Sequence, residues 1–515
     1  MDFDNSTSRV RLRTNRKISF NVENSLSAIL GFSNKIVDAN TKITGEFPVE
    51  ILKVNAIFID CNIAAGSFLN GRPVHIIHQF FPAVSPGSNM VFANHAELLD
   101  VTDKPYNDVS IENYQYHFYQ PTTSGTINYN DEVRIAIQDL EANTVPCDSY
   151  LYVEGKLTQD DDGITTQLEF INNAVAYLFK EIRYELNGTV IDSVRDVGLV
   201  STLKGYLSYT PNESSLLENA GWVAKKNKTV AKQGETLKDA ITRERIITDS
   251  AGNFNTIIPL KHLMGFFEDF RKLMIHMRQE LVIIRSSSDY DAVTSENETE
   301  KPKVTINRIS WVVPHVSLSL EEQININTIV KKGVGLPIHF RSWEIIEYPS
   351  LPTSTRHTWP VKTSTKVESP RHVIVAFQKD RKNKLTSDMS KFDNISLRNI
   401  KVFLNSDRYP YADLLLDFAN NKFATLYDMY ANFQESYYLT KTNQPVFNPK
   451  EFKNHAPIAH IDCSHQKDSL QTGSVVLRIE FETDVATTTD ISAYCLVLHE
   501  KLFIYNPLNK TVRQP

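Results

Sequence analysis

Apolar and polar residues alternate at the start of residues 181–192, where Ile182, Tyr184 and Leu186 are separated by charged side chains. This period of two places the three apolar side chains on one face of a strand. The Asn187-Gly188 pair that follows tolerates the positive φ angles of a tight type I′ turn. The pattern therefore predicts a β-hairpin over residues 181–192.

The same pattern returns at residues 399–410. Ile400, Val402 and Leu404 take the places of the three apolar residues of the first strand, and Asn405-Ser406 takes the place of the first turn. Two hairpins of this kind indicate a repeated unit, provided that other landmarks recur in the same order.

The landmarks upstream of the two hairpins do recur in order. Leu151 and Val373 begin similar strands 222 positions apart, and Phe170 precedes the first hairpin as Phe392 precedes the second, again 222 positions apart. Ile182 and Ile400 are 218 positions apart. A slip of this size fits a loop insertion, so we interpret the chain as containing a duplication.

The remaining pattern predicts mostly short strands, with helices as interruptions. Apolar residues recur at spacings of three and four over 262–279, which predicts an amphipathic helix of roughly four turns. Helical segments are also predicted after each hairpin, at 197–209 and within 412–433. Residues 319–370 are rich in Pro, Ser and Thr, which favours a long irregular connection.

Many short strands in two similar halves predict a mainly β protein built from two tandem β-sandwiches with short helices. The expected division has three parts: an N-terminal β-rich domain over 1–122, a first sandwich over 123–318, and a second sandwich over 319–515. The last part includes 319–370 as the connecting segment.

Composition narrows the class of protein. The chain has 515 residues, 41% of them hydrophobic and 23% charged, and a formal net charge of −6. These values are typical of a globular protein with a large core and exclude a polycation that coats nucleic acid. No run of about 18 apolar residues predicts a membrane span, and the polar start MDFDNSTS is unlike a signal peptide. Four scattered cysteines indicate free thiols in a reducing compartment.

One basic cluster lies near the N-terminus. It consists of Arg9, Arg11, Arg13, Arg16 and Lys17. In a strand, alternate arginines would share a face that could contact phosphate or an acidic partner. The alternative is a solvated edge strand that is kept charged to discourage strand pairing.

No catalytic or cofactor-binding motif is found. The patterns GxxxxGK[ST], GxSxG and HExxH are absent. The segment 455–465 holds a set of possible metal ligands: His455, His460, Asp462, Cys463 and His465. A strand would turn His460 and Asp462 to one face and Cys463 and His465 to the other, whereas zinc needs ligands that converge. We therefore expect no catalytic residue, cofactor or metal.

Several segments resemble the double jelly-roll major capsid proteins of polinton and adintovirus-type elements, including copies resident in animal genomes. They include FINNAVAYLFKEIRYELNG, RISWVVPHV, RSWEIIEYP, NIKVFLNSDRYPY and AYCLVLHEKLFIYNPL, and they occur in order over roughly 145–510. Residues 1–122 also look like sequence from this group, although an extra N-terminal domain departs from its simplest pattern.

The resemblance implies two eight-stranded jelly rolls per chain and a homotrimer that acts as a pseudo-hexagonal capsomer in an icosahedral shell. It implies neighbouring capsomers and penton or minor capsid proteins as partners, and genomic DNA enclosed without sequence-specific binding. It also implies synthesis in the cytosol without a signal peptide, residence in the virion capsid, no enzymatic activity, and it allows assembly in the host nucleus.

Two other functions fit tandem β-sandwiches. One is a carbohydrate-binding or surface-binding protein. The other is a hydrolase with a dispersed pair of carboxylates, which would have to lie about 5 to 10 Å apart.

Overall fold

The computed structural model describes the chain from residue 110 onward with several gaps, and gives only short strands before that point. The described ranges are 110–122, 125–139, 143–159, 168–227, 247–361, 370–465 and 475–514, together with Thr229, Lys232 and 240–241. The chain divides into two compact units, Met1–Asn107 and Asp108–Pro515. The predicted division into three domains stays a prediction.

Within Met1–Asn107 the structure gives four antiparallel strand pairs. They are β1 (Asp2–Asp4) with β2 (Arg9–Arg11), β3 (Ser19–Asn21) with β5 (Lys42–Thr44), β4 (Ala28–Ile29) with β6 (Phe58–Ile59), and β7 (Phe68–Leu69) with β8 (Arg72–Pro73).

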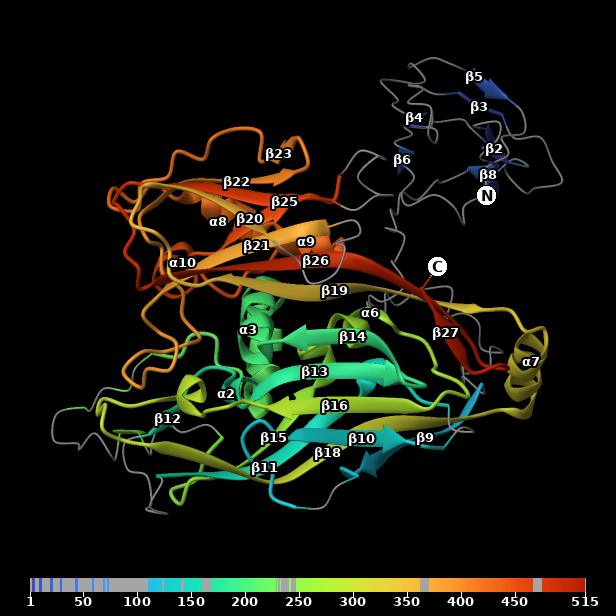
Figure 1. Ribbon diagram of the computed structural model, residues 1–515. Coiled ribbons are helices and arrows are strands. Elements are labelled where there is room, and N and C mark those ends of the chain that lie inside the picture. The colour runs from blue at the N-terminus through green and yellow to red at the C-terminus, as the bar shows by residue number, and fades with distance from the viewer. Residues whose placement is uncertain are drawn as a thin grey trace. The chain divides into compact units, whose positions relative to one another are not determined.

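The first half of Asp108–Pro515 contains two antiparallel four-stranded sheets (Figure 1). One sheet has the order β10 (Glu132–Ile137), β16 (Gln279–Arg285), β13 (Phe179–Leu186), β14 (Thr189–Arg195). The other has the order β15 (Asn253–Pro259), β11 (Tyr150–Gln159), β18 (Pro302–Leu318), β9 (Ile111–Tyr119). The short strands β12 (Glu169–Phe170) and β17 (Val293–Thr294) form a separate pair.

The second half repeats this plan. One sheet has the order β20 (Arg356–Val361), β25 (Leu477–Thr483), β22 (Leu397–Leu404), β23 (Asp407–Tyr409). The other has the order β24 (Ala459–Asp462), β21 (Pro370–Lys379), β26 (Ile491–Asn506), β19 (Leu336–Tyr348), and β27 (Thr511–Arg513) also pairs with β26.

The two halves have the same strand order. When the eight sheet strands of each half are numbered along the chain, both halves form one sheet in the order 2-7-4-5 and another in the order 6-3-8-1. This eight-stranded arrangement of two antiparallel sheets is the jelly roll. The predicted duplication is therefore confirmed, and with it the mainly β double jelly-roll fold.

The two predicted hairpins are confirmed as β13–β14 and β22–β23. Asn187, Gly188 and Asn405 adopt φ angles of 48°, 80° and 54°. Each asparagine also ties its turn to the neighbouring strand. The backbone N–H of Arg278 donates to Oδ1 of Asn187, and the backbone N–H of Val476 donates to Oδ1 of Asn405. Asparagine suits this position because it combines a left-handed backbone with a hydrogen-bonding side chain.

The two copies also share a β-bulge. In the first copy the register with β16 shifts between Phe179 and Glu181. In the second copy the register with β25 shifts between Leu397 and Asn399, which are again 218 positions further on. A bulge leaves one residue outside the ladder and bends the strand. The extra residue is Lys180 in the first copy and Arg398 in the second. The carbonyl of Lys180 accepts from the backbone N–H of Asp196 at 2.7 Å, and that of Arg398 accepts from the backbone N–H of Leu416 at 2.8 Å.

Helices connect and flank the strands. They are α2 (Ala174–Tyr177), α3 (Val197–Ser208), α4 (Pro211–Leu216), α7 (Leu320–Lys331), α8 (Ala424–Ala431), α9 (Phe433–Tyr438) and α10 (Pro449–His455). Those predicted after each hairpin are confirmed as α3 and, in the second half, as α8 with the start of α9. No helix that the structure describes combines the length and the apolar character that a membrane span requires.

The predicted four-turn helix over 262–279 is wrong. The segment holds only the end of a 3-10 turn and the short helix α6 (Gly265–Asp269), and Met274 then exchanges two backbone hydrogen bonds with Thr144. Its apolar side chains are buried on several sides instead of one. Phe266, for example, stacks on Tyr184 of the first jelly roll and contacts Phe340 of the second.

The predicted irregular connection over 319–370 is also wrong. Helix α7 and strands β19 and β20 lie within it. In β19 the buried residues Ile338, Phe340 and Ser342 alternate with more exposed ones, and the buried Trp343 then breaks the alternation. The many prolines, serines and threonines concealed this pattern, because they suit both loops and strand ends.

Candidate functional site

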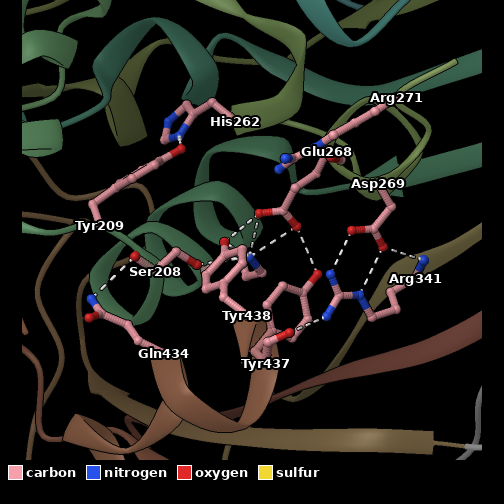
Figure 2. A network of polar contacts seen from close by, with 11 residues as sticks. Ser208, Tyr209, His262, Glu268, Asp269, Arg271, Arg341, Gln434, Tyr437 and Tyr438 are labelled. Carbon is pink, nitrogen blue, oxygen red and sulfur yellow. Dashed lines mark hydrogen bonds and ion pairs between the residues drawn. The ribbon is translucent and has the colours of Figure 1, made fainter. Parts of the chain in front are cut away.

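A network of buried and half-buried polar side chains lies where the two jelly rolls meet, and we call this region the junction. Helices α3 and α6 and strand β14 contribute from the first jelly roll, and β19 and α9 contribute from the second. Figure 2 shows Glu268 and Asp269 of α6 facing Tyr437, Tyr438 and Arg341. Because the flanking phenylalanines of α6 are buried, the two carboxylates are held at a fixed position.

Lys204 of α3 forms the centre of one half of the network. Its Nζ donates to the two carboxylate oxygens of Glu268 at 3.0 and 3.2 Å, and to the hydroxyl of Ser208 at 2.8 Å. Tyr438 completes the group, since its hydroxyl is 2.9 Å from the same Nζ and donates to Glu268. Burial lowers the pKa of Lys204 to about 8, although Glu268 opposes this effect.

Aromatic rings surround the same ammonium. Nζ of Lys204 lies 4.1 Å from the ring centre of Tyr437 and 4.9 Å from that of Trp343. Cation–π contacts of this kind strengthen when water is excluded. The Tyr437 hydroxyl also donates to Glu268 at 2.7 Å, so one carboxylate joins α6 to both tyrosines of α9.

Arg341 of β19 forms the other half of the network. Its guanidinium donates to both oxygens of Asp269 at 2.8 and 2.6 Å, and its backbone N–H donates to the same carboxylate at 2.8 Å. The guanidinium also lies 3.5 Å from the ring centre of Tyr437. Two parallel charge-assisted hydrogen bonds fix both distance and direction, so this pair sets the orientation of β19 against α6.

Gly265 lets α6 approach β19 closely. A Cβ atom at this position would lie 1.8 Å from the carbonyl oxygen of Arg341 and 3.0 Å from Nε1 of Trp343. Only glycine leaves room for a backbone at that distance. The close packing of the two jelly rolls therefore depends on this residue.

Asp192 of β14 is a second acidic anchor at the junction. Its fully buried carboxylate accepts from the hydroxyl of Ser342 at 2.6 Å and from the backbone N–H of Phe266 at 3.0 Å. Burial raises the pKa of Asp192, which opposes ionisation, while Lys501 and these hydrogen bonds favour it.

Helix α3 has further contacts with the second jelly roll. The Tyr206 hydroxyl donates to the carbonyl of Ser390, the Tyr430 hydroxyl donates to the carbonyl of Tyr206, and the side-chain amide of Gln434 donates to the carbonyl of Ser208. A buried polar group that loses its partner is costly. The junction therefore holds the two jelly rolls in one arrangement.

The histidines considered as metal ligands lie on β24 and near it. Nδ1 of His460 donates to the carbonyl of Met429 at 2.9 Å, so its Nε2 accepts from Nδ1 of His372 at 3.1 Å. Both rings are neutral, since burial lowers both pKa values, that of His372 to about 3. Asp462 is exposed and Cys463 is buried. Among the residues that the structure describes, no cluster of three such side chains could hold a metal ion.

The structure does not describe the side chains of the predicted basic cluster near the N-terminus. Arg9 and Arg11 belong to β2, which pairs with β1. The side chains of these residues, and Arg13, Arg16 and Lys17 entirely, lie outside the described residues. Their contact with phosphate or an acidic partner stays a prediction.

Sequence reasoning missed the residues of the junction. Lys204 is the one charged residue in the helix VGLVSTLKGYLS, and Glu268 and Asp269 lie between phenylalanines in GFFEDF. A charge inside an otherwise apolar segment is rarely buried without a partner. That signal could have marked these positions, but it could not have paired them.

Comparisons with known proteins agree with this fold. The model of the double jelly roll-like domain matches residues 168–503. A chain in a cryo-EM structure of the Sputnik virophage aligns with a TM-score of 0.53 and 9% identity, covering 84% of this chain and 94% of that chain. The Faustovirus major capsid protein aligns with a TM-score of 0.50 and 10% identity, covering 78% and 92%. A search among curated proteins finds no match.

The matched family model includes part of the first jelly roll and most of the second, from the residue before β12 to a position within β26, and so covers more than half of the chain. At such low identities the solved structures show a shared fold, and that fold is the one found in the Faustovirus major capsid protein. The chain belongs to the family of the double jelly roll-like domain.

Proposed function

We propose that this chain is a major capsid protein of the polinton and adintovirus lineage, and that three copies form a pseudo-hexagonal capsomer. The observation that supports this proposal most directly is the pair of jelly rolls with one strand order in a single chain. A structural protein needs interfaces and no covalent chemistry, and we assign it no catalytic residue.

The junction supports the proposal physically. Two similar modules in each chain give a cyclic trimer six near-equivalent flanks, which can tile a surface hexagonally. Such tiling requires that the two modules keep one relative orientation. The ion pair of the buried Lys204 with Glu268 and the half-buried pair of Arg341 with Asp269 provide that constraint.

The capsomers would then tile an icosahedral shell. In this proposal the chain lies in the virion capsid, contacts neighbouring capsomers and penton or minor capsid proteins, and encloses DNA without reading its sequence. The proposal places synthesis in the cytosol and allows assembly in the host nucleus. Permanent subunit interfaces commonly bury about 2,000 to 5,000 Å², so we expect the trimer to persist on dilution.

Light scattering and electron microscopy test this proposal. We expect the purified full chain to have three times its monomer mass at micromolar concentration, and to form hexagonal blocks or closed particles in micrographs. A strictly monomeric species would contradict the proposal. Binding of that monomer to a glycan array would instead favour a carbohydrate-binding β-sandwich protein.

A further inference from the structure

The first jelly roll has an exposed aromatic surface on the outer side of the sheet β15-β11-β18-β9. We call this surface the β9 face. It consists of the exposed residues Tyr114, Tyr116 and Phe118 and the half-buried residues Tyr150 and Tyr152. Phe118 and Tyr150 both lie opposite Val312 in the ladder, so they share one side of the sheet. Phe118 is 55% exposed and Tyr116 is 48% exposed.

The β9 face is ordered as well as apolar. The ring centres of Tyr114 and Tyr116 are 5.8 Å apart, and those of Tyr116 and Tyr150 are 5.7 Å apart. The Tyr114 hydroxyl donates to Asp148 at 3.0 Å. Preordered aromatic side chains lose little entropy on binding and are enriched at protein interfaces.

The corresponding surface of the second jelly roll is buried. The offset of 222 that joins Leu151 to Val373 joins Tyr150 to His372. His372 and Trp343 both lie opposite Leu498, as Tyr150 and Phe118 lie opposite Val312. Phe118 and Trp343 are therefore equivalent, yet Trp343 is only 1% exposed.

The first jelly roll covers this position in the second. Lys204 and Gly265 contact Trp343, and Asp269 binds the neighbouring Arg341. Strand β14 adds Asp192, which accepts from Ser342. Thus the β14 side of one module covers the first strand of the next module. This contact is heterologous, because the two modules use different surfaces.

Each chain has a second copy of both surfaces of that contact, and these second copies are exposed. The β9 face repeats the covered surface. Strand β23 repeats β14. Val402 is the equivalent of Tyr184 at the hairpin offset of 218, and it pairs with Tyr409 as Tyr184 pairs with Asp192, so Tyr409 and Pro410 take the positions of Asp192 and Ser193. We call Arg408, Tyr411 and Leu415 the β23 edge. Tyr411 is 80% exposed, and the Arg408 guanidinium lies 4.5 Å from its ring centre.

We infer that the β9 face of each chain is covered by the β23 edge of a second copy of this chain. The inference rests on the proposed function, because it repeats the contact within the chain as the contact between chains of the capsomer. A heterologous contact must either close into a ring or extend into a filament. Three chains complete a ring of six modules in which every first strand is covered. Tyr, Phe and Arg are the residues expected at the centre of such interfaces.

Two double variants of the full chain test this assignment. Tyr116→Glu with Phe118→Glu introduces charge on the β9 face, and Tyr411→Glu with Leu415→Glu introduces charge on the β23 edge. We expect each variant to be monomeric at micromolar concentration, since the loss of two apolar anchors weakens association by about 1,000-fold. Val485→Glu is the control, because Val485 is 65% exposed in the loop between β25 and β26.

Mixing the two variants gives a sharper result. The first variant keeps an intact β23 edge and the second keeps an intact β9 face, so the mixture can form one interface but cannot close a ring. We expect light scattering to show a species with the mass of two chains. Unchanged circular dichroism and melting temperature of each variant alone would show that both remain folded.

The outcomes separate this inference from the proposed function. A trimeric wild type whose two variants remain trimeric overturns the inference and leaves the proposed function intact. Persistence of the trimer only in the β9-face variant, with new protease cleavage within 1–107, would show that the N-terminal segment covers this face and would also overturn the inference. A monomeric wild type overturns both, and loss of glycan binding in the β9-face variant would then identify a sugar platform.

Discussion

Replacing Gly265 by alanine should separate the two jelly rolls. The new Cβ atom would lie 1.8 Å from the carbonyl oxygen of Arg341, a backbone atom that no side-chain rotation can move. Relief of this contact requires a shift of about 1.6 Å to reach ordinary van der Waals separation. The shifted peptide links Arg341 to Ser342, and both residues donate to carboxylates of the first jelly roll.

The expected cost in free energy combines the weakening of these hydrogen bonds with the strain of the new close contact. A hydrogen bond to a charged group contributes about 1.5 to 3 kcal/mol, and overpacking a close contact costs about 1 to 3 kcal/mol. Gly265→Ala should therefore lower the free energy of unfolding by about 5 kcal/mol. Urea denaturation of the full chain measures this change, and hydrogen exchange should show loss of protection in β19 and α6.

Gly188→Ala is the matched control. Gly188 has a φ of +80° but no heavy atom within 4 Å of an added Cβ, so its cost is conformational only. We expect about 1 kcal/mol for this variant. The reasoning fails if Gly265→Ala stays within about 1 kcal/mol of wild type and the exchange rates in β19 are unchanged.

Three further predictions concern single side chains. Glu268→Gln should lower the free energy of unfolding by about 3 kcal/mol, because the buried Lys204 ammonium loses its carboxylate partner. In a double-mutant cycle measured by thermal denaturation, adding Lys204→Met should recover part of this loss. Burial holds the pKa of both His262 and His372 at about 3, below the usual 6.5. As the pH falls below 6.5, these two histidines therefore gain protons only in the unfolded state, which stabilises the unfolded state. The free energy of unfolding, measured by urea titration, should be constant above pH 6.5 and should be lower by about 2 kcal/mol per histidine at pH 5. A flat profile would refute neutral burial. Asn405→Ala should cost about 1 kcal/mol through loss of its turn hydrogen bond, and an unchanged melting temperature would contradict that role.

The duplication could be predicted from the sequence because its signals are local. Alternation over six residues and an asparagine in the turn define a hairpin without any knowledge of the rest of the fold. The helix predicted over 262–279 failed for a physical reason. Spacings of three and four indicate a helix only when one side of the segment is buried, and here two modules enclose it.

The junction could not have been predicted in this way. Lys204 and Glu268 are 64 positions apart, and Arg341 is a further 73 positions away, in a segment that was interpreted as irregular. Only the packing of four elements from two modules brings these charges together. Their partners follow from tertiary structure, for which the sequence carries no local pattern.

The bulge shared by β13 and β22 bears on the origin of the chain. Few residues are identical between the two modules, yet each of the two strands has an unpaired residue at the same position. In both strands the carbonyl of that residue accepts a hydrogen bond from the segment that follows the next strand in the chain. An ancestral gene for one module that already possessed this irregularity, copied once in tandem, accounts for both. The bulge in the backbone has thus been retained while most of the amino acids of the two modules have changed.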